Sequence, residues 1–204
     1  MMGVRFTFSQ EKALAAIELL AEAGMNDLTK GKIAKLLFFA DKRHLVQNGR
    51  PIIGDWYAAL PHGPVPSQVD NLLDAFEAGN GNFPGVDVMN KIFLLDTKFQ
   101  YPHLTKLPNA PNGTLREHLS ESDIEVLQAC IAQLGILTFS QLRSISHDQP
   151  AYTNAWESRG LSKDAAPMSF EDFFEDDPDS FAGVKESMIE DFMLHQRFAE
   201  PKFD

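Results

Sequence analysis

The chain has little or none of several features that mark secreted, membrane and redox proteins. It contains a single cysteine, Cys130, which cannot form an internal disulfide, so no feature of its cysteine content points to secretion. No run of 18 or more apolar residues occurs, so no membrane span is expected. The first residues, MMGVRFTFSQEK, lack the charged and then apolar pattern of a signal peptide. We therefore expect a cytoplasmic protein.

The short motifs that identify common catalytic and cofactor sites are also missing. There is no GxGxxG or GxxxxGK[ST] loop for nucleotide phosphates, no Gly-x-Ser-x-Gly elbow, and no HxxxH, HExxH or CxxC pair. Cys130 falls on the apolar face of a helical pattern, which indicates a buried structural thiol and not a nucleophile. We therefore expect no enzyme activity, cofactor or metal.

Positive charge is scarce, and negative charge is unevenly distributed. The net charge is -11 and the isoelectric point is near 4.9, which argues against nucleic-acid binding because that requires clustered Lys and Arg. Residues 163–204 hold twelve acidic and four basic residues, a net of -8, so residues 1–162 carry only -3. A basic partner for the C-terminal end is physically reasonable.

Helical patterns dominate what is present. Apolar residues at helical spacing, with capping signals and glycine stops, predict helices over residues 10–23, 30–46, 66–78, 120–134, 138–146 and 150–156. Ser9 is the expected N-cap of the first helix, and Ser120 with Asp123 three residues on resembles a capping box.

Extended structure is predicted in two places. A short strand is expected near residues 55–59, after which Pro61, Pro64 and Pro66 should interrupt regular pairing. Residues 92–101 suggest a β-hairpin that turns at Asp96–Thr97. The predicted fold class is mainly α (α+β with a small antiparallel sheet), a compact multi-helix domain with a short β-hairpin.

The C-terminal region differs in composition from the rest, so we divide the chain into residues 1–160 and an acidic, Phe-rich segment, residues 161–204. Seven of the sixteen phenylalanines lie between Phe170 and Phe203, and a purely disordered tail contains few aromatic residues. We expect this segment to pack back onto the domain or to fold on a partner, with a last helix over residues 184–198.

The segment from Lys32 to Val69 is dense in residues with special backbone demands. Gly54-Asp55-Trp56-Tyr57 is followed by His62-Gly63-Pro64, where Gly63 is expected to take a positive φ and the residue before each proline is extended. This pattern predicts a stiff corner between a strand and a helix. The corner either serves only to redirect the chain between two elements, or it is a rigid, aromatic-lined surface for a protein partner, since Trp and Tyr are favoured at interfaces. For His62 we favour a structural role, in which it stabilises the corner, over direct contact with a partner.

Ser140 to Trp156, SQLRSISHDQPAYTNAW, is a second unusual segment. We expect His147 to bond a neighbouring backbone group or carboxylate and so to join two short helices.

Two alternative functions remain open. Asp41 and His44 share one helix face, and with His62 they could form an open metal site of a hydrolase. The helices after Ser120 and the hairpin could instead form a winged-helix-like DNA-binding unit. Arg116 and Arg143, however, are too few for a convincing phosphate-contacting face.

The two unusual segments carry a family resemblance. LLFFAD, GRPIIGD and YAALPHGPV, followed by ISHDQPAY with Trp156 beyond it, resemble the SocA-like antitoxin family, also called the Panacea domain. The resemblance covers roughly residues 10–160. The chain has Phe38-Phe39 where Tyr is frequent in the family, His62 where Tyr often precedes Gly-Pro, and Tyr152 where Trp is common.

This resemblance implies a mainly helical fold with a small sheet, in a bacterial or phage (prophage) protein. It implies an antitoxin of a two-gene toxin–antitoxin system that neutralises a cognate toxin by direct binding, and possible action as an adaptor that delivers the toxin to the ClpXP protease. The residues that we select as partner-binding or motif positions are Asp41, Gly54, Asp55, Trp56, Tyr57, His62, Gly63, Pro64, His147 and Trp156.

Overall fold

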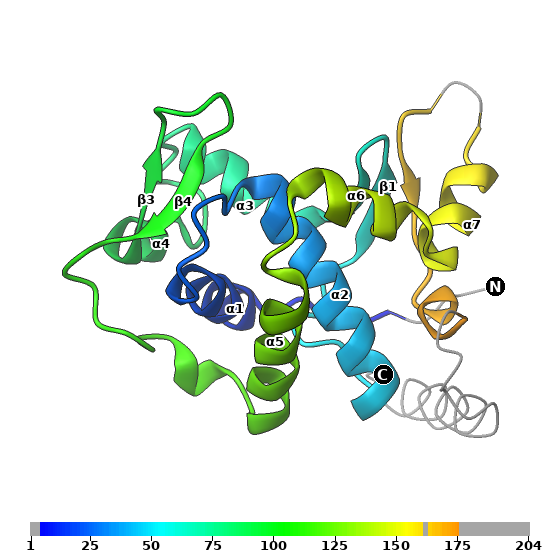
Figure 1. Ribbon diagram of the computed structural model, residues 1–204, viewed down its shortest axis with the longest axis horizontal. Coiled ribbons are helices and arrows are strands. Elements are labelled where there is room, and N and C mark those ends of the chain that lie inside the picture. Colours follow the sequence, from blue (N-terminus) through cyan, green and yellow to red (C-terminus); the bar gives the residue numbers. More distant parts are fainter. Residues whose placement is uncertain (1–4, 161–162, 176–204) are drawn as a thin grey trace, which may run out of the picture.

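The computed structural model describes residues 5–160 and 163–175, and it is mainly helical with two small antiparallel sheets (Figure 1). The helices are α1 (Gln10–Glu22), α2 (Lys30–Asn48), α3 (Ser67–Glu77), α4 (Val86–Ile92), α5 (Glu121–Leu134), α6 (Phe139–His147) and α7 (Pro150–Ser158). The strands are β1 (Tyr57–Leu60), β2 (Gly63–Pro66), β3 (Phe93–Asp96), β4 (His103–Lys106) and β5 (Ala166–Pro167). Two 3₁₀ turns are η1 (Arg116–His118) and η2 (Glu171–Phe174). The predicted fold class is confirmed.

The helix ends follow the predicted capping signals. The Ser9 hydroxyl accepts the Lys12 N–H at the start of α1, and Ser120 and Asp123 form a reciprocal capping box at the start of α5. Such caps satisfy N–H groups that have no partner within the helix. The last helix that we predicted, over residues 184–198, lies outside the described residues.

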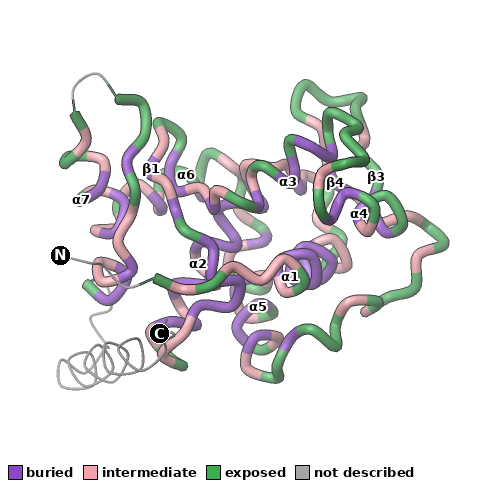
Figure 2. The backbone as a smooth tube through the Cα atoms, turned by 180° about the vertical axis from the view of Figure 1, so that it is seen from behind, coloured by how far each residue is buried: buried purple, intermediate pink, exposed green. Residues whose placement is uncertain are grey.

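Helix α2 forms the centre of the molecule. It packs against α5, α6 and β2, and the aromatic turn η2 covers its other side (Figure 1). Its apolar residues Ile33, Leu36 and Leu37 are buried together with the apolar face of α1. Figure 2 shows that buried positions are concentrated on α1 and α2. We call residues 32–69 and 140–156 the two motif segments. Helix α2 belongs to the first and can position side chains toward the rest of it and toward the second.

Strand β2 corrects our prediction that the prolines after residue 60 exclude regular pairing. Residues Gly63–Pro66 pair with β1, with Tyr57 opposite Pro66 and Ala59 opposite Pro64. The carbonyl of Tyr57 accepts the Met168 N–H on the other side of β1, so the Tyr57–Pro66 pair needs no bond from the missing proline N–H. Proline is tolerated on an edge strand for this reason, and β2 is an edge of the order β2-β1-β5.

The second hairpin begins where we predicted and returns later than we predicted. Strand β3 pairs with β4 from Phe93 opposite Lys106 to Asp96 opposite His103, so our expected second strand near Tyr101 is wrong. The Asp96 side chain accepts the Lys98 N–H in the turn, and the strand resumes at His103, which bridges to Thr29. The short helix α4 before β3 was not predicted.

Residues 163–175 pack onto the domain. Strand β5 adds to β1, and Phe170, Phe173 and Phe174 are buried with Phe38 and Tyr57 in one aromatic cluster. Burial of these rings explains the aromatic richness at the start of the acidic segment. The division of the chain at residue 160 stays a prediction.

Within the described part of the chain, no helix taken singly has the length and apolar character needed to cross a membrane. Helices α5 and α6 meet that test only as a pair, across a 110° bend.

Candidate functional site

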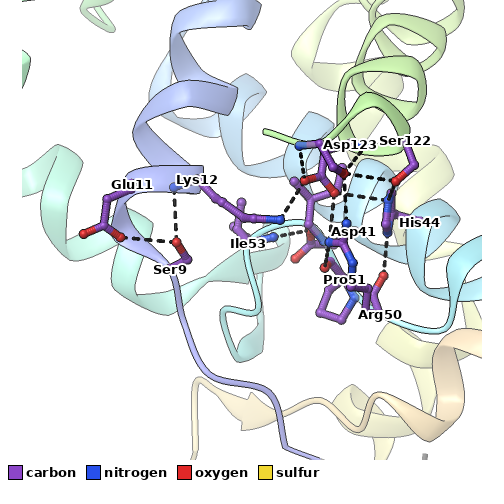
Figure 3. A network of polar contacts seen from close by, with 12 residues as sticks. Ser9, Glu11, Lys12, Asp41, His44, Arg50, Pro51, Ile53, Ser122 and Asp123 are labelled. Carbon is purple, nitrogen blue, oxygen red and sulfur yellow. Dashed lines mark hydrogen bonds and ion pairs between the residues drawn. The ribbon is translucent and has the colours of Figure 1, made fainter. Parts of the chain in front are cut away.

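The candidate site is the corner around β1 and β2 where the two motif segments meet. Asp41 fixes the loop that leads into β1. Asp41 lies on α2, and one carboxylate oxygen accepts the N–H groups of Ile52 (2.8 Å) and Ile53 (3.0 Å). The other oxygen accepts the Tyr57 hydroxyl at 3.1 Å. Figure 3 shows Asp41 facing Ile53 in this loop. The carboxylate thus fixes the path of the chain from α2 into β1.

Asp55 anchors the second side of the same loop. Its carboxylate accepts the N–H groups of Gln68 (2.9 Å) and Val69 (2.9 Å) in the first turn of α3. The residue at the N-cap of that helix, Pro66, has no side chain able to cap, so Asp55 takes over the capping role from a distance. The sequence next to the start of α3 therefore contains no capping residue of the usual kind.

Burial sets the protonation of both carboxyl groups. Complete burial raises the pKa of Asp41 to about 7, and its three donors offset only part of the loss of hydration. Burial also raises the pKa of Asp55 to about 6, against the opposing effect of the helix N–H groups. Neither carboxylate has a free oxygen directed at a ligand, since each is engaged by backbone donors.

Gly54 allows a close backbone approach beside these anchors. It has a φ of 67°, and a Cβ there would lie 2.4 Å from the carbonyl oxygen of Thr7. The N-terminal segment runs over the loop at this point, where the Ser9 N–H donates to the Ile53 carbonyl. Gly54 is therefore required by packing and strain rather than by a ligand.

The two neighbouring aromatic residues have different environments. Trp56 is 57% exposed, whereas Tyr57 is 1% exposed and packs among Phe38, Phe170 and Phe173. Tyr57 is thus a core residue that bonds Asp41, while Trp56 is available to a partner at the start of β1.

The turn between β1 and β2 is held from below by Lys35. This lysine of α2 is 1% exposed, and its ammonium donates to the Pro64 carbonyl at 2.9 Å. Gly63 has a φ of 101°, and a Cβ there would lie 2.7 Å from Lys35 Cε and 2.8 Å from the Ser146 hydroxyl. The prediction of positive φ at Gly63 is confirmed, with a tight contact as an additional constraint.

The second motif segment bonds to the same β1–β2 turn. The Tyr152 hydroxyl donates to the Leu60 carbonyl at 2.9 Å, and the Arg143 guanidinium donates to the Pro61 carbonyl at 3.1 Å. Carbonyls at the end of β1 and in the turn are thereby bound by α6 and α7. The two motif segments are joined by bonds that span 82 and 92 residues of sequence, and they form one structural corner.

His147 and Trp156 complete an aromatic stack on α6 and α7. His147 stacks on Tyr152 with ring centroids 4.4 Å apart, Trp156 stacks on the same ring at 5.9 Å, and Arg159 lies 3.5 Å over Trp156. His147 therefore joins α6 to α7 by ring stacking, and its Nε2 is buried without a hydrogen-bond partner in the described part of the chain. The hydrogen bond that we expected for it is not formed.

His62 lies in the exposed two-residue turn between β1 and β2, so it does not hold the corner through burial. Sequence reasoning missed Lys35, Arg143 and Ser146. The signal for Lys35 was a lysine within an otherwise apolar face of α2, where a charged residue is buried only if it is bonded.

A second buried network binds α2 to α5 (Figure 3). His44 donates from Nδ1 to the Arg50 carbonyl at 2.7 Å, and its Nε2 lies 3.1 Å from both the Ser122 hydroxyl and Asp123 Oδ1. Asp123 also pairs with Lys12 at 2.6 Å and with Arg50 at 2.9 Å. The Arg50 contact is an ion pair without an aligned hydrogen bond, since Oδ1 has no partner of that geometry among the described residues.

The charges in this network complement one another. Burial alone would raise the pKa of Asp123, but Lys12, the Ser120 N–H and Arg50 outweigh it and hold the pKa below its ordinary value. Burial lowers the pKa of His44. The network joins α1, α2 and α5 around the Arg50 loop, which is a structural role.

The predicted alternative metal site is not assembled. Asp41 is bonded to the loop backbone, His44 faces Arg50 and Asp123, and His62 lies in the β1–β2 turn. Across residues 5–160 and 163–175, no three His, Cys, Asp or Glu side chains lie close enough to hold a metal ion. The hydrolase hypothesis that used these residues is therefore wrong.

The winged-helix alternative is also not supported by the packing. The β3–β4 hairpin contacts α1 and α4, while α6 packs on α2 and β2, so the hairpin and these helices do not form one unit (Figure 1). Cys130 is buried, and burial raises the pKa of its thiol to about 11, in keeping with the predicted structural role.

Comparison with known proteins gives one positive finding. Residues 33–153 match the model of a protein family described as antitoxin SocA-like, Panacea domain. The match covers more than half of the chain and includes the first motif segment from Ile33 and the second as far as Thr153. No curated protein and no solved structure matches the chain significantly.

Proposed function

The chain belongs to the SocA-like antitoxin family, Panacea domain, and from this premise we propose that it neutralises a partner toxin by direct protein binding. The observation that carries the proposal is the corner: both family segments converge on the β1–β2 turn, bonded there by Lys35, Arg143 and Tyr152.

The chemistry of the corner supports binding over catalysis. The carboxylates of Asp41 and Asp55 are engaged by backbone N–H groups, so neither is positioned as a general acid or base facing solvent. Trp56 is exposed beside a backbone that buried groups hold rigid, and a rigid aromatic side chain is a favoured interface anchor. We therefore propose a non-catalytic antitoxin.

Co-expression tests this proposal. The reading frame adjacent to the gene is expressed alone and together with this chain in a bacterial host, and colony formation is measured. The neighbour should be toxic alone and harmless with this chain, and the two proteins should co-purify. A neighbour that is harmless alone, or that stays toxic in the presence of this chain, contradicts the proposal.

The fate of the bound toxin is a separate question. The family resemblance implies an adaptor role, in which the chain delivers the toxin to the ClpXP protease. In that form of the proposal, deleting ClpXP should lengthen the toxin's half-life and restore toxicity although the complex still forms. Unchanged neutralisation in the deletion strain would leave direct inhibition as the mechanism.

We place this activity in the cytoplasm, without a nucleic-acid or membrane partner. The acidic C-terminal segment would contact a basic surface of the toxin, because its net charge of -8 complements such a surface. Most of that segment, residues 176–204, lies outside the described residues. A shortened chain ending at residue 175 should then keep the corner and bind a basic toxin more weakly.

A further inference from the structure

The corner gathers basic side chains in an acidic protein. Four basic groups meet around the β1–β2 turn: Lys35 from α2, His62 in the turn, and Arg143 and His147 from α6, which we call the basic corner. Several other buried or partly buried cations are paired with carboxylates, such as Lys32 with Asp27 and Lys106 with Glu22. The basic corner differs from these sites in its partners.

The two strongest cations of the basic corner bind backbone carbonyls instead of carboxylates. Lys35 donates to Pro64 and Arg143 donates to Pro61, and no carboxylate of the described residues forms an ion pair with either. Asp70 attracts Lys35 from a distance, but it is itself paired with Lys30 at 3.0 Å.

Lys35, Arg143, His62 and His147 lie close enough for charge on one to affect the protonation of another. The pKa of Lys35 is lowered to about 8, mainly by burial, with Asp70 opposing this effect and Arg143 adding to it. Burial also lowers the pKa of His147, with Arg143, Lys35 and His62 acting in the same direction and Asp148 opposing them. A negative group brought to this point would relieve the repulsion.

We infer that the basic corner is the part of the partner-binding surface that receives a carboxylate-bearing, acidic segment of the toxin. This inference rests on the proposed function and names the chemistry of the partner. Arg143 and His62 are exposed and can contact an incoming carboxylate, while Lys35 supplies charge from beneath Gly63. A guanidinium binds a carboxylate through two parallel hydrogen bonds.

A polypeptide fits this site better than a nucleic acid does. The chain carries a net charge of -11, which repels a phosphate backbone over its length. An acidic segment presents a few carboxylates at one point and needs only a local cluster of cations. The inferred partner is therefore an acidic protein segment.

A titration that needs no toxin tests the preference directly. The chain has six histidines, so the imidazole proton signals can be resolved by NMR, with His62→Gln used to assign one of them. The probe is N-acetyl-triglutamyl amide, and the matched control is the triglutamine peptide. The glutamate peptide should produce saturable shifts at His62 and His147 but not at the exposed His118 of η1.

Charge reversal localises the effect. Arg143→Glu should weaken the apparent affinity for the glutamate peptide at least about tenfold, while Lys91→Glu on α4, an equal change of net charge, should not. Both substitutions are at exposed positions, and circular dichroism melting should confirm that both variants fold. Absence of shifts at His62 and His147, or equal affinities of the two variants, would overturn the inference.

Co-expression with the toxin separates this inference from the proposed function. If wild type and Lys91→Glu neutralise the toxin and Arg143→Glu does not, the result supports the inference that the toxin binds through the basic corner. If Arg143→Glu neutralises as well as wild type, the toxin does not use the basic corner and only the inference fails. If wild type neutralises no neighbour, the proposed function fails, while the peptide titration still decides whether the corner binds carboxylates.

Discussion

The part of the motif segment (residues 32–69) that follows α2 and the β3–β4 hairpin (residues 93–106) are both strand-containing excursions from the helical core, yet they are held in different ways. In the motif segment, buried polar side chains bind the backbone: Asp41 holds two loop N–H groups and Lys35 holds a turn carbonyl. In the hairpin, the connection between the strands projects Phe99, 52% exposed, and Tyr101, 67% exposed.

This difference teaches where the geometry of the molecule is most constrained. A loop whose backbone groups are bound by buried side chains has few alternative arrangements, because each alternative leaves a buried donor or acceptor without a partner. The hairpin loop has water as an alternative partner. The motif segment is therefore suited to present a fixed surface, and substitutions in it should cost more stability than substitutions in the hairpin.

The largest expected effect comes from removing the central carboxylate. Asp41→Ala leaves two loop N–H groups and the Tyr57 hydroxyl without their acceptor, so we expect a loss of ~3–5 kcal/mol of unfolding free energy. The matched change in the hairpin, Asp96→Ala, removes one turn acceptor and should cost less than ~1 kcal/mol. Urea denaturation measures both, and similar losses would remove the contrast between the regions.

The pH dependence of stability tests the protonation of the same group. Because the pKa of Asp41 in the folded chain is raised to about 7, the folded state holds a proton that the unfolded state releases above its ordinary pKa near 3.8. Its contribution is therefore present at pH 4 and is lost as the pH rises through about 7. Asp55 acts in the same direction up to about pH 6.

Asp41→Asn isolates this contribution. The variant has no proton to release, so its cost relative to wild type should shrink by ~2–4 kcal/mol between pH 4 and pH 7.5. Denaturation at several pH values gives this difference directly. A cost that is constant with pH would show that Asp41 is ionised throughout the range.

Gly63→Ala should have the next largest effect. The added Cβ combines an unfavourable φ of 101° with overlap against Lys35 Cε, so we expect a loss of ~2–3 kcal/mol. Gly79→Ala is the control, because Gly79 also has a positive φ but has open space around its Cβ position, and should cost ~1 kcal/mol. Equal melting temperatures for the two variants would show that Lys35 moves aside at no cost.

The smallest effect on stability is expected at the exposed aromatic residues. Trp56→Ala and Tyr101→Ala should each change the unfolding free energy by less than ~1 kcal/mol, since both side chains are exposed. Their effects on binding should differ: Trp56→Ala should weaken toxin binding at least ~tenfold, as an anchor residue does, whereas Tyr101→Ala should not. Equal effects on binding would extend the partner-binding surface to the hairpin.

The helices were predictable because their signals are local. Ser9, Thr138 and the Ser120–Asp123 capping box mark helix starts within a few residues of the bonds that they form. The short helix α4 escaped prediction because its N-cap, Gly85, makes no side-chain cap bond, and its seven residues show too little periodicity.

The site was only partly predictable because its bonds are long-range. Asp55 was selected as a motif residue, but its capping of α3 spans fourteen residues of sequence to Val69. The positions of Lys35 under Gly63 and of Tyr152 against Leu60 depend on the packing of α2, α6 and α7. The resemblance indicated that the two segments belong together, and the structure shows the contacts that join them.

Strand β5 has a mechanical consequence. Only Ala166 and Pro167 are registered against β1, with one further bond from the Met168 N–H to the Tyr57 carbonyl. A force that pulls on the chain beyond residue 175 would first load η2, which packs against α2 and α7 and is followed by Glu175, whose carboxylate accepts the Asn154 amide of α7; β5 would be loaded after it. Strand β1, which begins next to Trp56, is thus reached by such tension only through η2 and β5.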